Sequence, residues 1–304
     1  MLKTTYKKSP ESPGKRRVQY IGASLMAAVL LMLAGCDSGA ISPKGLIATE
    51  ELKLSIFAIE LMLIVVIPVI FMAFWFGWRY REGRNGKYSP EWCHSTILEL
   101  IWWSIPITII AILGTATWKT THDLDPYKPL VSEKKPVKVE VISLDWKWLF
   151  IYPEYQIATI NYMKLPVNTP VDFRITAASP MNSFIIPQLG GQIYAMTGMK
   201  TELHLIADAL GDYRGLATNY TGIGFSEMNF NTEVVSDEAF ADWVSSVKKT
   251  SEKLSSSIFW DQLVPPSIKV PTKDFGDVEP GLFDGVVMRY MMPHEAHHVM
   301  HEAH

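Results

Sequence analysis

Two long runs of apolar residues dominate the first half of the sequence. The first run, 54–78, has Glu60 as its only charged residue, and the second, 97–118, has only Glu99. A helix needs about 20 apolar residues to cross the hydrocarbon core of a bilayer, so both runs are long enough. Tryptophans gather towards the ends of the runs, as they do at membrane interfaces. The pattern predicts a transmembrane hairpin.

A shorter apolar run, 21–34, follows a basic N-terminal stretch. This combination is typical of a secretory signal peptide. The run ends in Leu-Ala-Gly-Cys, with the cysteine at Cys36. That ending resembles the lipobox of bacterial lipoproteins, which implies cleavage before Cys36 and attachment of lipid to its thiol. The alternative is an ordinary signal peptide with a chance cysteine.

Charge predicts the orientation of the hairpin. The loop between the runs, 79–96, has a net charge of +2, whereas the segment 37–53 before the first run has −1. Basic loops stay in the cytoplasm, so both flanks of the hairpin are expected outside. Export of Cys36 requires the same orientation. Everything from Lys119 onward is therefore expected to be extracytoplasmic.

After residue 136 the pattern changes to the period of two that is typical of strands. Val137, Val139 and Val141 alternate with polar residues, and a run of aromatic residues follows. Gly, Pro and Asn separate further short runs. These runs are 157–165, 171–177, 182–186, 200–207, 211–217 and 228–235. The pattern predicts an antiparallel β-sandwich.

A helix is expected after the strands, because Ser236 can cap it and basic residues at 248–249 suit its C-terminal end. The predicted organisation has six parts along the chain. They are a signal peptide at 1–35, a lipidated N-terminus at 36–53, a hairpin at 54–118 with its loop at 79–96, an extracytoplasmic domain at 119–249, a C-terminal arm at 250–292 and a tail at 293–304.

Composition narrows the possible functions. The 304 residues carry a net charge of −3, and removal of 1–35 leaves −8, which argues against nucleic acid as a partner. The chain has two cysteines, Cys36 and Cys93, too few for a disulfide framework, a four-thiolate zinc site or an iron–sulfur cluster. Their expected positions on opposite sides of the membrane prevent them from forming a joint copper site.

Several long motifs resemble subunit II of the haem–copper respiratory oxidases. These motifs are KYSPEW, TWKTTH, SLDWKWLFIYP, MNSFIIPQLGGQIYAMTGM and YTGIGFSEM. Together they span most of the chain, and they match best the branch of cytochrome bo-type ubiquinol oxidases, whose members are also made as lipoproteins. The resemblance implies a two-helix transmembrane hairpin followed by an all-β cupredoxin-like Greek-key sandwich and a C-terminal helical arm.

The copper ligands distinguish the two branches of this family. Members that oxidise cytochrome c hold two copper ions with bridging cysteines, histidines and a methionine. Alignment on Gly222 and Met228 assigns the ligand positions of this chain, which are Asn182, Ala217, Thr221, Phe225 and Met228. Soft thiolates are required to hold such a copper pair, and a single thioether is a weak site. The sequence therefore predicts a domain without copper, and the resemblance implies the quinol-oxidising branch.

Two carboxylates lie within the apolar runs. Intramembrane ionisable residues are often functional, and for Glu99 alone an interfacial role is the alternative. The resemblance implies that Glu99 stands at the cytoplasmic mouth of a proton channel in subunit I. Glu60 is not a hallmark of the family. It is expected at the level of the lipid headgroups or paired with a polar group of another subunit.

Two further features of the sequence bear on function. Trp146 and Trp148 match the region that carries electrons to copper in the other branch, and without copper they are expected to form core and docking surface. The tail carries His294, His297, His298, His301 and His304. Its spacing would suit a weak copper or zinc site, but a solvated, disordered tail is the favoured interpretation.

The resemblance as a whole implies a subunit without an active site or cofactor of its own, in a bacterial inner membrane, with its main domain in the periplasm. Its partners would be oxidase subunit I, which would hold the haems and the oxygen-site copper, smaller membrane subunits, membrane lipid, and ubiquinol at the level of the complex. Two alternatives stay open. They are a cytochrome c oxidase subunit with a degenerate copper site and a freestanding cupredoxin-like lipoprotein.

Overall fold

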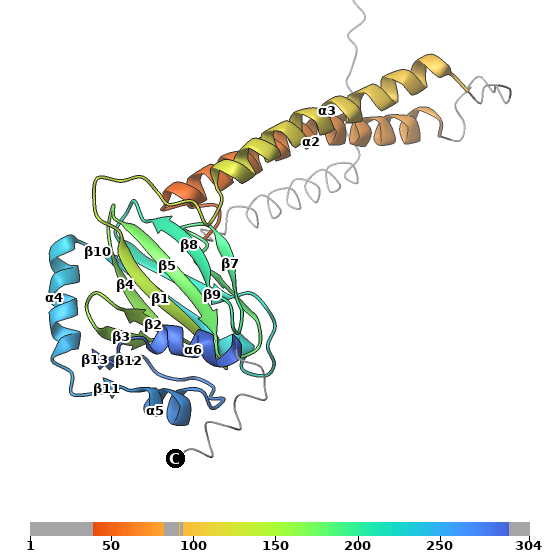
Figure 1. The fold of residues 1–304 in the computed structure, drawn as a ribbon. Helices are drawn as coiled ribbons and strands as arrows, with labels where there is room; N and C mark the ends of the chain where they lie inside the picture. Colours follow the sequence, from red (N-terminus) through yellow and green to blue (C-terminus); the bar gives the residue numbers. More distant parts are fainter. Residues whose placement is uncertain (1–38, 82–90, 92–93, 292–304) are drawn as a thin grey trace, which may run out of the picture. The chain divides into compact units, whose positions relative to one another are not determined.

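The computed structural model describes residues 39–81, 91 and 94–291. Both predicted spans are helices, α2 over Leu46–Arg79 and α3 over Thr96–Asp123 (Figure 1). Each helix is longer than the apolar run that predicted it, because hydropathy marks only the part suited to hydrocarbon and not the polar turns that continue the helix. Their most apolar windows are almost entirely exposed within this chain, which leaves these surfaces for lipid or partner helices.

Two sheets form the β domain (Figure 1). The first sheet has the order β12-β3-β2-β1-β5-β8, and the second has the order β4-β10-β9-β6-β7. This arrangement confirms the predicted cupredoxin-like sandwich. The strands of the first sheet are β1 Val137–Leu144, β2 Lys147–Tyr152, β3 Ile157–Ile160, β5 Pro170–Ala177, β8 Thr201–Ile206 and β12 Lys273–Phe275. Those of the second are β4 Tyr162–Pro166, β6 Asn182–Ile185, β7 Gln192–Ala195, β9 Gly211–Ala217 and β10 Asn229–Val235.

The sheets are mixed, so the prediction of a purely antiparallel sandwich was wrong. β1 pairs in parallel with β5, and β10 pairs in parallel with β4. Alternation of apolar residues shows which side chains face the core, but it does not depend on the direction of the neighbouring strand.

The predicted strand 157–165 is two strands that belong to different sheets. The chain turns at Asn161, whose φ of 58° lies in the left-handed region. The Asn161 side chain secures the turn, because its Oδ1 accepts the Trp148 N–H at 2.9 Å and its Nδ2 donates to the Val270 carbonyl at 2.8 Å. The sequence pattern also missed β7, which is short and partly exposed.

The first sheet is covered on both faces. Between the sheets, the rings of Trp148, Phe184 and Phe230 pack together, with the last two stacked at 5.1 Å. On the outer face, the arm packs Phe259, Phe275 and Phe283 into a second apolar cluster. Every residue of β2 is therefore buried. The arm consists of β11 Lys253–Leu254, α5 Ser256–Ile258, η2 Phe259–Leu263, β12, β13 Asp277–Val278 and α6 Leu282–Met291.

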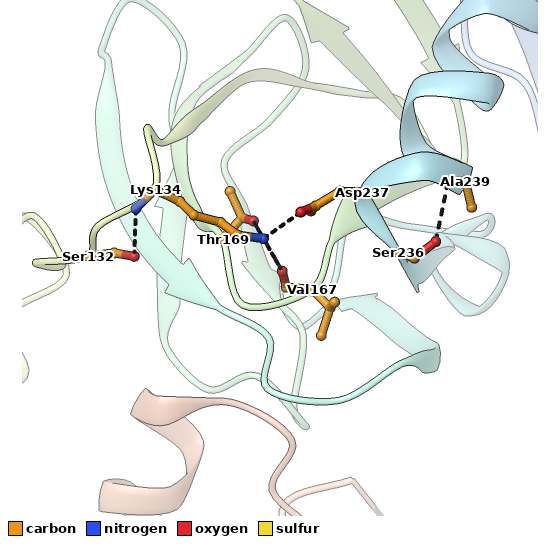
Figure 2. A network of polar contacts seen from close by, with 7 residues as sticks. All are labelled: Ser132, Lys134, Val167, Thr169, Ser236, Asp237 and Ala239. Atoms are coloured by element: carbon orange, nitrogen blue, oxygen red, sulfur yellow. Dashed lines mark hydrogen bonds and ion pairs between the residues drawn. The ribbon is translucent and has the colours of Figure 1, made fainter.

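The predicted helix after the strands is α4, Asp237–Lys248. The Ala239 N–H donates to the Ser236 hydroxyl at 3.3 Å, which is the expected N-cap (Figure 2). Lys134, in the linker that leads from α3 to β1, reaches the same place. Its Nζ donates to Asp237 Oδ2 at 2.7 Å and to Thr169 Oγ1 at 3.3 Å (Figure 2). The linker is thus fastened to α4 and to the turn before β5.

The start of α2 is fastened to the sandwich by main-chain contacts. The Lys44 N–H donates to the Gln188 carbonyl at 2.7 Å, and the Ala48 N–H donates to the Leu189 carbonyl at 3.2 Å. The Gly191 N–H donates to Glu51 Oε1 at 3.1 Å. Both connections between the helices and the β domain are therefore held by specific hydrogen bonds.

Candidate functional site

The positions that hold copper in one branch of the resembled family gather at one end of the second sheet. Asn182 begins β6, Ala217 ends β9, and the loop after β9 contains Thr221. Phe225 opens the short helix η1, Phe225–Glu227, and Met228 follows it. The fold therefore brings together a strand start, a strand end and one loop, as a ligand cluster would require.

Asn182 and Met228 are bonded to each other in the centre of this cluster. Asn182 Nδ2 donates to the Met228 sulfur at 3.0 Å, and both residues are buried. Asn182 Oδ1 accepts the Ser183 N–H at 2.8 Å. The Ala217 N–H donates to the Met228 carbonyl at 3.2 Å. The amide of Asn182 is thus engaged on both sides, as a buried polar group should be.

The remaining two positions pack against aromatic rings. The Thr221 carbonyl accepts the Trp146 indole N–H at 3.1 Å, and the Phe225 ring meets Tyr220 edge-on at 5.6 Å. Trp146 also lies directly against Gly224, where an added Cβ would come within 2.3 Å of the indole. The loop is therefore shaped around a tryptophan.

The donor set at these positions does not fit a binuclear copper centre. It consists of an amide, a methyl group, a hydroxyl, a phenyl ring and one thioether, with no thiolate and no imidazole. Within the described ranges 39–81, 91 and 94–291, no group of three or more His, Cys, Asp or Glu side chains is placed to hold a metal ion. The cluster can pack and position a loop, but it offers no redox centre.

Trp148 belongs to the core, which is one of the two roles predicted for Trp146 and Trp148. Its ring is fully buried and touches Phe184 and Phe230. Its indole N–H has no hydrogen-bond partner among the residues that the structure describes, which is unusual for a buried tryptophan. Trp146 is only partly buried and braces the loop described above.

Glu99 lies in the first turn of α3, four residues after the N-cap residue Ser95. Its Oε1 is 2.8 Å from His94 Nδ1, and both side chains are more than half exposed in this chain, at 58% and 60%. The sequence reading named Glu99 but missed His94. The sequence does carry a signal for this contact. If α3 begins after Ser95, the side chain of His94, which precedes the N-cap, can reach forward to the first turn.

The other positions predicted from the sequence lie in α2 or outside the described residues. Glu60 lies in α2 and is exposed. Cys36, Cys93 and the five histidines of the tail, His294, His297, His298, His301 and His304, lie outside the described residues.

Known proteins similar to this chain identify its family. Cytochrome bo(3) ubiquinol oxidase subunit 2 of Pseudomonas aeruginosa is 49% identical over 281 residues, which cover 92% of this chain and 85% of that protein. The chain belongs to the ubiquinol oxidase subunit 2 family. Ubiquinol oxidase subunit 2 of Acetobacter aceti, another relative, is 49% identical over 86% of this chain and 85% of its own length.

More distant members of the family match a smaller share of the chain. Quinol oxidase subunit 2 of Bacillus subtilis is 36% identical over 79% of this chain and 76% of that protein. The family model described as the COX Aromatic Rich Motif matches residues 248–294, which include the arm that covers the first sheet. Membership in this family therefore extends from the hairpin to the arm.

Solved structures of oxidases were also found. The periplasmic domain of subunit II of cytochrome oxidase from Bradyrhizobium japonicum is 24% identical, with a TM-score of 0.37, and covers 40% of this chain and 98% of that chain. A chain of a heme-copper terminal oxidase dimer is 14% identical, with a TM-score of 0.36, and covers 45% of this chain and 99% of that chain.

Proposed function

We propose that this chain is the copper-free, membrane-anchored subunit II of a proton-pumping ubiquinol oxidase, which oxidises ubiquinol and reduces oxygen to water. The relatives that cover most of its length and are named as ubiquinol oxidase subunits support the proposal. The hairpin packs against oxidase subunit I and smaller membrane subunits, and the sandwich covers the periplasmic side. The haems and the oxygen-site copper belong to subunit I, and this chain contributes no catalytic residue.

The N-terminus is proposed as a lipid anchor in the bacterial inner membrane. The lipobox-like sequence that ends in Cys36 supports lipidation of this residue, and the basic loop supports a cytoplasmic position for 79–96. The lipid and the two spans would then hold the sandwich on the periplasmic side by three attachments.

The role proposed for Glu99 is to admit protons from the cytoplasm to a path through subunit I. A carboxylate in the first turn of a span lies at the membrane boundary, where it can exchange protons with water. His94 is in contact with the Glu99 carboxylate at 2.8 Å and can pass a proton to it or take one from it. This chain would move the proton at Glu99 Oε1 and leave the redox chemistry to its partner.

Replacement of Glu99 tests this role. Glu99→Ala in the purified complex should slow quinol oxidation and reduction of the oxygen site by roughly 10²-fold, the lower end of what positioned proton transfer contributes. Glu91→Ala is the matched control, because Glu91 is an exposed carboxylate of the loop that precedes α3. Unchanged turnover and unchanged reduction of the oxygen site in Glu99→Ala would remove the proposed role.

A metal analysis tests the copper-free assignment and the rival cytochrome c oxidase subunit. The isolated chain, expressed with copper supplied, should contain far less than one copper ion per chain, because its ligand positions offer only the Met228 thioether. Two copper ions per chain, with the absorption of a thiolate-bridged pair, would support the rival.

A further inference from the structure

Glu60 is the one charged residue between Leu54 and Trp78 of α2. It lies 18 residues before Trp78, which corresponds to about 27 Å along the helix axis. Trp78 and Arg79 mark the end of the span where aromatic and basic residues meet the headgroups. With a hydrocarbon core about 30 Å thick, the Glu60 carboxylate falls just inside the opposite boundary.

The Glu60 face of α2 is not the face that holds the sandwich. Ile47 and Ala48 are buried, and Glu51 accepts a hydrogen bond from the sandwich. Glu60 follows Glu51 by nine residues, which places it about 180° around the helix. Contacts with the β domain therefore do not explain this carboxylate.

The surroundings of Glu60 along the helix are apolar and exposed. Its neighbours on the same face are Ile56, Ile64 and Ile67, of which the last two are 59% and 60% exposed. A carboxylate in such a stripe has no counter-charge within α2, because the nearest base of that helix, Lys53, bonds to Glu50 at 2.7 Å. In hydrocarbon an uncompensated carboxylate is strongly unfavourable, so a charged side chain at this depth calls for an opposite charge.

We infer that the face of α2 around Ile56, Glu60 and Ile64 docks on a transmembrane helix of a partner subunit, and that Glu60 pairs there with a lysine or arginine near the outer boundary of the bilayer. The inference rests on the proposed function in that the partner is a subunit of the same oxidase. Charge complementarity selects this partner over lipid tails, which offer nothing to a carboxylate, and contact with lipid headgroups is the alternative that the test separates from it.

Replacement of Glu60 in the full-length chain, expressed with its partner subunits, tests the inference. Glu60→Leu makes the span more apolar, so insertion of α2 should be at least as good as in the wild type. If Glu60 pairs with a base, its loss leaves that base buried without a counter-charge. The amount of Glu60→Leu chain that stays with the haem-containing complex in mild detergent should then fall roughly 10-fold or more.

Two further variants sharpen the result. Glu60→Gln keeps the shape and can still accept a hydrogen bond from the base, so its retention should lie between wild type and Glu60→Leu. Glu50→Gln removes an exposed carboxylate two to three turns earlier on α2 and should leave retention unchanged. Glu60→Leu that remains bound as well as the wild type, or better, would overturn the inference and place Glu60 against lipid.

The wild-type preparation separates this inference from the proposed function. A wild-type chain that carries no haem-containing partner overturns the proposed function, and the docking site with it. Haem that co-purifies with wild type and equally with Glu60→Leu overturns the docking site alone.

Discussion

At the scale of single residues, a hydrogen bond between an amide and a thioether lies at the centre of the five positions that match copper ligands. Asn182 Nδ2 donates to the Met228 sulfur. The Ser183 N–H donates to Asn182 Oδ1, and the Ala217 N–H donates to the Met228 carbonyl. The sequence was enough to predict which residue types occupy the ligand positions. It could not predict that the amide and the thioether would bond to each other, because that contact depends on how β6 meets the chain after η1.

A second residue-scale feature is the buried phenol of Tyr152. Burial raises the pKa of Tyr152 above its ordinary value, and the hydroxyl donates to the Lys164 carbonyl at 2.9 Å. The same tyrosine ionises near pH 10 in the unfolded chain. Between pH 10 and the higher pKa of the folded state, ionisation favours the unfolded chain, so stability is present below pH 10 and is lost as the pH rises above it.

Tyr152→Phe tests this dependence. Its free energy of unfolding should be about 1 kcal/mol lower than wild type at pH 8, because one hydrogen bond is lost. Between pH 10 and 11 the wild type should lose about 1 kcal/mol more than the variant. The measurement is denaturant unfolding of the detergent-solubilised chain at each pH. A constant difference between wild type and variant at all pH values would contradict the account.

At the scale of elements, the helices and most strands follow from the hydrophobic pattern, but their ends and partners do not. Hydropathy located both spans yet missed the polar turns by which α2 reaches the sandwich at Gly45 and Ala48. Alternation found β1 and β5 but not their parallel pairing. The pattern does not predict the short elements of the arm, because its apolar residues are spaced to match the outer face of a sheet far away in sequence.

The attachment of α2 depends on a close approach at Gly45. An added Cβ would lie 2.6 Å from the Ile206 carbonyl oxygen, which belongs to the backbone and cannot easily move. Gly45→Ala should therefore loosen the main-chain contacts there and lower the stability of the chain by about 1–3 kcal/mol.

Gly77→Ala is the matched control, because Gly77 lies within α2 and nothing lies within 4 Å of an added Cβ. It should leave stability unchanged or raise it by up to about 1 kcal/mol. Thermal unfolding of both variants in the same detergent gives the comparison. Equal melting temperatures would show that the contact at Gly45 is not required.

At the scale of the whole molecule, the chain combines two long apolar helices with a β-sandwich that the C-terminal arm covers. The five ligand positions do not offer the donors of a binuclear copper centre, the loop after β9 packs around Trp146, and the arm covers the outer face of the first sheet. In the proposed complex, this domain covers the periplasmic side and is joined to the two spans. Glu99 and Glu60 lie near opposite ends of the hairpin, and the roles proposed for them concern the contacts of the spans within the complex.

The most direct test of this account is the visible spectrum of the full-length chain purified with its partners in mild detergent, recorded before and after addition of ubiquinol. We predict that haem co-purifies with the chain and that ubiquinol reduces it, whereas reduced cytochrome c does not. A colourless preparation of the chain alone, or haem that accepts electrons from cytochrome c and not from ubiquinol, would contradict the account.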